Sequence, residues 1–162
     1  KLAASHRLYE AVGALMERDE VRELVRRALR IPLNAGPMGN ITDYFVTAFA
    51  NNDFLSTHND AAAGSAAFVY HLADWQGGQG GELRFNRGRA AGDRDFRPAF
   101  NRMLLFLTRP GSTPHQVLRV HGDSPRFGFT GWYLTPGDRF TPYELAQNLK
   151  MRADANKYAQ CV

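Results

Sequence analysis

The sequence predicts a mainly β domain, a sandwich or barrel with flanking helices. In the first 30 residues, apolar positions recur at steps of three and four, which is the period of amphipathic helices. From residue 42 onwards, short apolar runs alternate with clusters of Gly, Pro and Asp, a pattern typical of short strands joined by turns. Among folds built in this way, the cupin-like jelly roll is the one that carries a metal at its mouth.

The expected elements follow in order along the chain. One or two helices are expected between residues 5 and 29, packed on the outside of a sheet. Segment 31–37 ends them, because proline lacks a backbone donor and glycine favours turns. A final helix is expected over residues 141–155, with Thr141 as N-cap, Pro142 at N1 and Glu144 at N3. Loops are expected at 61–67 and 87–94, and strands at 42–49, 53–58, 66–72, 81–85, 103–108, 115–120 and 126–134.

Length and composition predict a single domain over residues 1–162, with helical support at 1–36, a jelly-roll core at 42–136 and the helix at 141–155. The net charge is +4, but no long run of basic residues occurs, so we do not expect nucleic-acid binding. The sequence has no apolar stretch of about 18 residues and no signal-peptide pattern, which predicts a soluble protein without a membrane partner. The single Cys161 fits a cytoplasmic or other reducing compartment. Oligomeric state is left open.

Two histidines and one aspartate form a candidate metal site. His58 and Asp60 lie two residues apart, so on a strand their side chains point to the same face. His115 follows much later, at the start of another predicted strand. Two imidazoles and a carboxylate can occupy one face of an octahedral ferrous ion and leave the opposite face open for catalysis. The alternatives are a hydrogen-bonded surface pair and a buried structural histidine.

A second group on the last predicted strand is a candidate co-substrate site. Arg126, Thr130 and Trp132 share one face of this strand by the period-two rule. A guanidinium can hold a carboxylate with two parallel hydrogen bonds, and the Thr130 hydroxyl can donate a third. Trp132 is expected to wall the pocket against water. The alternatives are a surface salt bridge for Arg126 and ordinary packing for Thr130.

Taken in series, four stretches resemble the 2-oxoglutarate and Fe(II)-dependent dioxygenases, most closely their prolyl-hydroxylase branch. They are 57–60 (THND), 70–85 (YHLADWQGGQGGELRF), 100–117 (FNRMLLFLTRPGSTPHQV) and 124–134 (SPRFGFTGWYL). The resemblance implies a double-stranded β-helix that uses Fe(II), 2-oxoglutarate and O2, with ascorbate as a candidate reductant. It also implies that His58, Asp60 and His115 bind iron, that Arg126 and Thr130 bind 2-oxoglutarate, and that the phenol of Tyr70 reaches this co-substrate. For Tyr70, as for Thr130, the alternative is ordinary packing. One departure is Phe49, the nearest aromatic residue where family members often carry a tyrosine before the His-x-Asp motif.

The resemblance implies hydroxylation of an unactivated C–H bond, with release of succinate and CO2. Related halogenases lack a carboxylate at the position of Asp60, so its presence favours hydroxylation. We expect a prolyl or other residue of a protein or peptide as substrate, with a free amino acid or small natural product as the alternative. An alternative of another class is a non-catalytic, cupin-like metal-binding or sensing domain. Candidate substrate contacts, besides Trp132, are Arg84, Arg102 and Tyr133; His71, on the opposite face from Tyr70, is expected to have a packing role.

Overall fold

The computed structural model describes residues 7–32, 36, 38, 41–60, 63–88, 91–108 and 114–136. Its elements are α1 (Arg7–Met16), α2 (Asp19–Ala28), β1 (Ile41–Phe49), β2 (Leu55–His58), β3 (Ala66–His71), β4 (Leu83–Phe85), β5 (Arg94–Phe96), β6 (Met103–Leu107), β7 (His115–Val117) and β8 (Arg126–Tyr133). The two N-terminal helices and a strand in each predicted strand segment are confirmed. The predicted helix at 141–155 lies outside the described residues.

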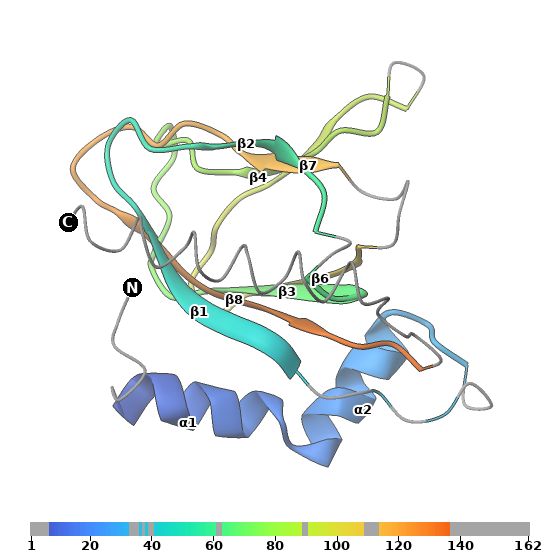
Figure 1. The fold of residues 1–162 in the computed structure, drawn as a ribbon. Coiled ribbons are helices and arrows are strands. Elements are labelled where there is room, and N and C mark those ends of the chain that lie inside the picture. Colours follow the sequence, from blue (N-terminus) through green and yellow to red (C-terminus); the bar gives the residue numbers. More distant parts are fainter. Residues whose placement is uncertain are drawn as a thin grey trace.

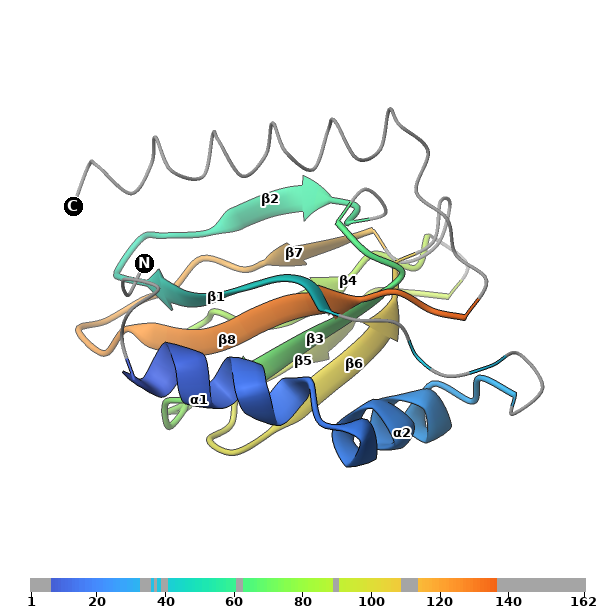
Figure 2. The same ribbon diagram turned by 60° about the horizontal axis from the view of Figure 1, so that its bottom comes forward.

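Two four-stranded sheets face each other, as expected for a jelly roll of the double-stranded β-helix type. Their strand orders are β1-β8-β3-β6 and β2-β7-β4-β5, and all pairs of neighbouring strands are antiparallel. Both helices cover the outer face of the β1-β8-β3-β6 sheet (Figures 1 and 2), which confirms the predicted position of the helical support. None of the described helices is both long and apolar enough to cross a membrane.

Strand β5 was not predicted, because its segment was expected to form part of a loop. The strand has only three residues, two of them charged, so it carries no apolar period of its own. It is held by β4 instead: Phe85 packs edge-on against Phe96, and Arg84 forms an ion pair with Asp95 across the two strands. Contacts between strands thus override a local pattern that predicts a loop.

The central strand β3 divides the interior into two cores. Ala66 and Phe68 face the helices, in a core that also contains Met16, Val25 and Phe129. Ala67 and Val69 face the other sheet, in a core shared with Leu83, Phe85, Phe106, Val117 and Trp132. Because side chains alternate along a strand, each residue of β3 and β8 belongs either to the helix-facing core or to the space between the sheets.

Candidate active site

The three predicted metal ligands come together at one end of the space between the sheets. His58, at the end of β2, lies opposite His115, at the start of β7, and their ring centroids are 4.3 Å apart. Asp60 follows His58 after the strand has ended. One potential ligand atom from each residue lies within 4.8 Å of the other two. The donor set and its spacing therefore fit a single metal ion held by two imidazoles and one carboxylate.

Asp60 is the centre of this group. Its Oδ1 lies 3.4 Å from His58 Nε2, and its Oδ2 lies 3.3 Å from His115 Nε2. Burial raises the pKa of Asp60, but the hydrogen bond and charge of His115, the charge of His58 and the neighbouring Trp132 side chain outweigh burial and lower the pKa below its usual value. The carboxylate is therefore ionised at neutral pH, as a metal ligand must be.

The orientation of His58 is set by a contact with the backbone. Its Nδ1 donates a hydrogen bond of 2.8 Å to the Ser56 carbonyl oxygen. This bond leaves the lone pair on Nε2, the nitrogen that faces Asp60. Metal-binding histidines in proteins are commonly oriented by such a second hydrogen bond.

The triad lines a cavity of about 180 Å3 between the sheets. The walls are mostly apolar, and they come from both sheets. The cavity is lined by Phe45, Thr47, Phe49, Leu55, His58, Asp60, Ala67, Val69, Leu83, Phe106, His115, Val117, Arg126, Thr130 and Trp132. This volume is smaller than the roughly 300–1,000 Å3 of pockets for drug-sized ligands. The cavity is therefore of a size to hold a small molecule.

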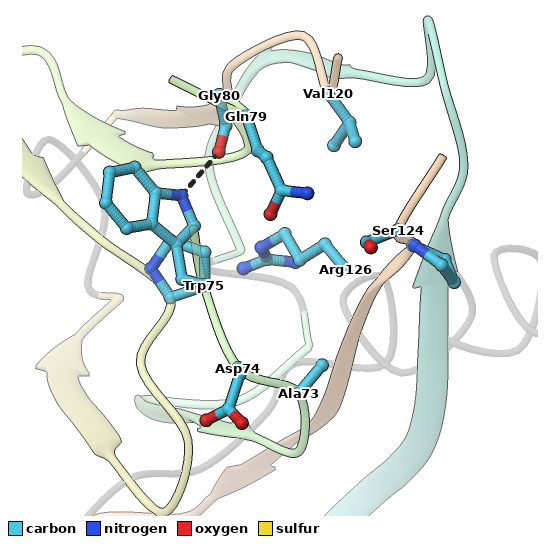
Figure 3. Close-up of a pocket in the computed structure, with 10 residues that line it drawn as sticks. Ala73, Asp74, Trp75, Gln79, Gly80, Val120, Ser124 and Arg126 are labelled. Atoms are coloured by element: carbon cyan, nitrogen blue, oxygen red, sulfur yellow. Dashed lines mark hydrogen bonds between the residues drawn. The ribbon is translucent and has the colours of Figure 1, made fainter. Parts of the chain in front are cut away.

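Arg126 is a buried cation with no acidic partner among the described residues. It is 7% exposed, and its Nε has no hydrogen-bond acceptor in the described part of the chain. Its guanidinium carbon lies 5.2 Å from the centroid of the Phe49 ring, and burial lowers the pKa of Arg126 to about 10. Its guanidinium also borders a small cavity with Trp75, Gln79 and Ser124, in which the carboxylate of Asp74 turns away from it (Figure 3). A buried guanidinium without an acid is costly, so this site suits an anionic ligand.

Thr130 and Trp132 lie on the same face of β8 as Arg126, and both line the cavity. Trp132 is 8% exposed and packs on Phe45 at a ring-centroid distance of 5.6 Å. Because the Trp132 side chain also lowers the pKa of Asp60, Trp132 connects the His-Asp-His group with the strand that carries Arg126. The structure thus brings His58, Asp60, His115, Arg126, Thr130 and Trp132 into one cavity.

Four other predicted site residues lie outside this cavity. The Tyr70 side chain packs with the helix-facing core, and its hydroxyl donates a 2.5 Å hydrogen bond to Asn101 Oδ1. Tyr133 is fully buried on the helix-facing side and donates to the Met16 carbonyl oxygen at 2.7 Å. Arg84 faces out from β4 and pairs with Asp95. Arg102 donates to the Arg97 carbonyl oxygen and lines a separate surface cleft.

Two residues inside the fold were not predicted as site residues. Thr47 lies between Phe45 and Phe49 on the cavity-facing side of β1, where it donates to the Gly128 carbonyl oxygen at 3.2 Å. His71, expected to pack, is fully buried, and its pKa is lowered to about 4 by burial and by the charges of Arg126 and Arg102. The period-two rule places His71 and Tyr70 on opposite faces of β3. The sequence could therefore have indicated His71 if the face of β3 that points towards the cavity had been known.

Comparisons with known proteins agree with this geometry. Residues 42–134, more than half of the chain, match the family model described as the 2OG-Fe(II) oxygenase superfamily. No curated protein matches the sequence. Solved structures with a similar fold include a prolyl-4-hydroxylase from Pseudomonas putida, with 22% identity and a TM-score of 0.61 over 82% of this chain and 69% of that one.

Two further structures resemble the chain over much of its length. One is a Trichoplax adhaerens prolyl hydroxylase in complex with a peptide from the oxygen degradation domain of hypoxia inducible factor, at 22% identity and a TM-score of 0.62, covering 89% of this chain and 62% of that one. The other is a prolyl 4-hydroxylase from Phytophthora capsici, at 19% identity and a TM-score of 0.57, covering 89% and 52%. This chain therefore spans less than two thirds of those two proteins. At these identities the similarity shows a common fold.

Proposed function

Because the chain belongs to the 2OG-Fe(II) oxygenase superfamily, we propose that it is a hydroxylase that uses Fe(II), 2-oxoglutarate and O2. The observation that carries this proposal is the presence in one cavity of a His-Asp-His triad and a buried arginine without an acidic partner among the described residues. In this superfamily, iron and 2-oxoglutarate together supply the oxidising power, and the co-substrate leaves as succinate and CO2. His58, Asp60 and His115 would hold the metal.

The remaining cavity residues would position the co-substrate and keep water away. Arg126 and Thr130 would hold the far carboxylate of 2-oxoglutarate, so that its 2-oxo acid end extends towards the triad. The apolar walls formed by Phe45, Phe106 and Trp132 limit the access of water to the reacting atoms. A small polar molecule with a charge at each end matches a cavity whose two ends are a metal site and a cation.

The proposed substrate is a prolyl residue of a protein or peptide. Three arguments support it: the similar folds of several prolyl hydroxylases, the peptide bound to the Trichoplax relative, and a cavity too small to enclose a peptide. A residue of an extended peptide can present a single C–H bond to the triad from outside the cavity. A free amino acid is the alternative substrate.

The test begins with anaerobic titration of the protein with Fe(II) and then with 2-oxoglutarate. We expect a weak visible metal-to-ligand charge-transfer band, which Asp60→Ala should not give, and slow succinate formation after oxygen is added. Proline-containing peptides should then accelerate succinate formation and gain one oxygen atom. Bound metal without a band would overturn the oxygenase proposal in favour of a metal-binding domain. Acceleration by free amino acids alone would overturn the peptide assignment.

A further inference from the structure

His71 is a polar side chain buried without compensation. It is 0% exposed, and neither of its ring nitrogens has a hydrogen-bond partner among the residues that the structure describes. Buried polar groups are nearly always hydrogen-bonded, because their removal from water is otherwise unfavourable. The imidazole therefore needs a hydrogen-bond partner that the described residues do not provide.

The strand register places this imidazole next to Arg126. His71 on β3 lies directly opposite Gly128 on β8, and Gly128 has Arg126 and Thr130 as its neighbours on the same face. Because Gly128 has no side chain, nothing on β8 screens His71 from these two residues. Burial lowers the pKa of His71 most, and the charge of Arg126 lowers it further, as expected for a nearby cation. Ala73, two residues after His71, lines the small cavity that Arg126 also borders.

The protonation state of His71 suits it to be a hydrogen-bond donor. Its pKa of about 4 makes the ring neutral at pH 7, so one nitrogen carries a hydrogen and the other carries a lone pair. A carboxylate beside it could accept the imidazole N–H and the unpartnered Nε–H of Arg126 together. A single ligand would then satisfy two buried groups that have no partner in the described structure.

We propose that His71 joins Arg126 and Thr130 in binding the far carboxylate of the co-substrate, and that His71, rather than Tyr70, is the additional side chain that recognises it. This inference rests on the proposed function and makes it specific about how a dicarboxylate is selected. The phenol of Tyr70 cannot take this role in the observed fold, because it faces the helix side of the sheet and is bonded to Asn101.

The test compares His71→Phe with Tyr70→Phe, a matched control on the adjacent residue and the opposite face. The dissociation constants of 2-oxoglutarate and of pyruvate are measured from the charge-transfer band, under argon with Fe(II). Pyruvate has the same 2-oxo acid end but no far carboxylate. A hydrogen bond to a charged group contributes roughly 1.5–3 kcal/mol. His71→Phe should therefore raise the dissociation constant of 2-oxoglutarate at least tenfold. Pyruvate should bind both variants as it binds the unchanged protein, and Tyr70→Phe should leave both constants unchanged.

A conservative variant separates recognition from packing. His71→Gln keeps a neutral N–H donor and should recover much of the 2-oxoglutarate affinity that His71→Phe loses. If His71→Phe weakened the binding of pyruvate and of 2-oxoglutarate equally, His71 would have a structural role, and the inference would be overturned. An unchanged 2-oxoglutarate constant in His71→Phe, or a loss confined to Tyr70→Phe, would also overturn it. The proposed function fails by a different result, the absence of a 2-oxoglutarate complex with the unchanged protein.

Discussion

Arg126→Met should stabilise the ligand-free protein while removing its affinity for 2-oxoglutarate. Methionine has a similar length and is apolar, so it can fill the same space without a buried charge. The arginine is 7% exposed and forms no ion pair with any described residue. A residue retained for ligand binding is expected to weaken the fold in this way.

The magnitude follows from the effect of burial on the guanidinium. Burial lowers the pKa of Arg126 well below its usual value, to about 10. At ~1.4 kcal/mol for each pKa step, burial of the charged form costs about 3 kcal/mol. This cost is present at any pH below the lowered pKa, and it disappears only as pH rises above 10 towards the usual pKa of arginine. Loss of the contact between the Arg126 guanidinium and the Phe49 ring cancels about 1 kcal/mol of the stability gained by removing the buried charge. The expected net gain in the free energy of unfolding is therefore about 2 kcal/mol.

The assay is urea unfolding at pH 7, with and without Fe(II) and 2-oxoglutarate under argon. Without ligand, Arg126→Met should unfold at a higher urea concentration than the unchanged protein. With ligand at about 100 times its dissociation constant, the unchanged protein should gain roughly 2.7 kcal/mol, and the variant should gain only what the metal contributes. Arg94→Met is the control: Arg94 is exposed and also stacks on a phenylalanine, at 4.9 Å from the Phe96 centroid. It should shift stability by less than about 0.5 kcal/mol. A ligand-free Arg126→Met protein less stable than the unchanged one would refute the reasoning.

Three further predictions concern the metal, the backbone and pH. Asp60→Ala should lose Fe(II)-dependent succinate formation with an unchanged far-UV circular dichroism spectrum, and retained turnover would contradict its assignment as a ligand. Gly80→Ala should lower the free energy of unfolding by roughly 1–3 kcal/mol in urea, because Gly80 has φ +68° and a Cβ there would collide with the Arg119 carbonyl oxygen. Gly77, with open space around it, is the matched control, and equal losses for the two alanine variants would contradict the argument. His71 stays neutral in the fold down to about pH 4 but is protonated below about 6.5 when unfolded; the unfolded chain therefore binds more protons, and stability should fall by about 2 kcal/mol from pH 7 to pH 5. His71→Phe should lose about 2 kcal/mol less stability than the unchanged protein over this pH range. The same dependence of the free energy of unfolding on pH in both proteins would contradict the prediction.

The elements that could be predicted are those with a local pattern. The 3.6-residue period of the N-terminal segment predicts α1 and α2, and alternating or apolar runs predict all strands except β5. The side chains of Arg126, Thr130 and Trp132 could be assigned to one face, because the period of a strand is two wherever the strand begins. The rule does not cover Asp60, which follows His58 after β2 has ended, although the two side chains still lie together.

What the sequence could not predict is which face of a strand points inwards. Tyr70 and His71 were correctly placed on opposite faces, but the choice between them depends on the helices, which pack against one side of the sheet only. If the helices packed against the opposite face of this sheet, the phenol of Tyr70 would point into the cavity. The ion pair of Arg84 could not be predicted for a related reason: its partner Asp95 lies on β5, a strand that forms only through pairing with β4.

Strand β8 turns every second residue towards the cavity and the others towards the helix-facing core. Arg126, Thr130 and Trp132 face the cavity, whereas Phe129 and Tyr133 anchor the helices. Insertion of one residue near the start of this strand would exchange the two sets, because a shift of one position turns every side chain to the other face. Phenylalanine and tyrosine rings would then fill the cavity, and threonine and tryptophan would face the helices. A single insertion or deletion within β8 should therefore disrupt the cavity and the helix-facing core together, whereas a replacement affects only the side on which it lies.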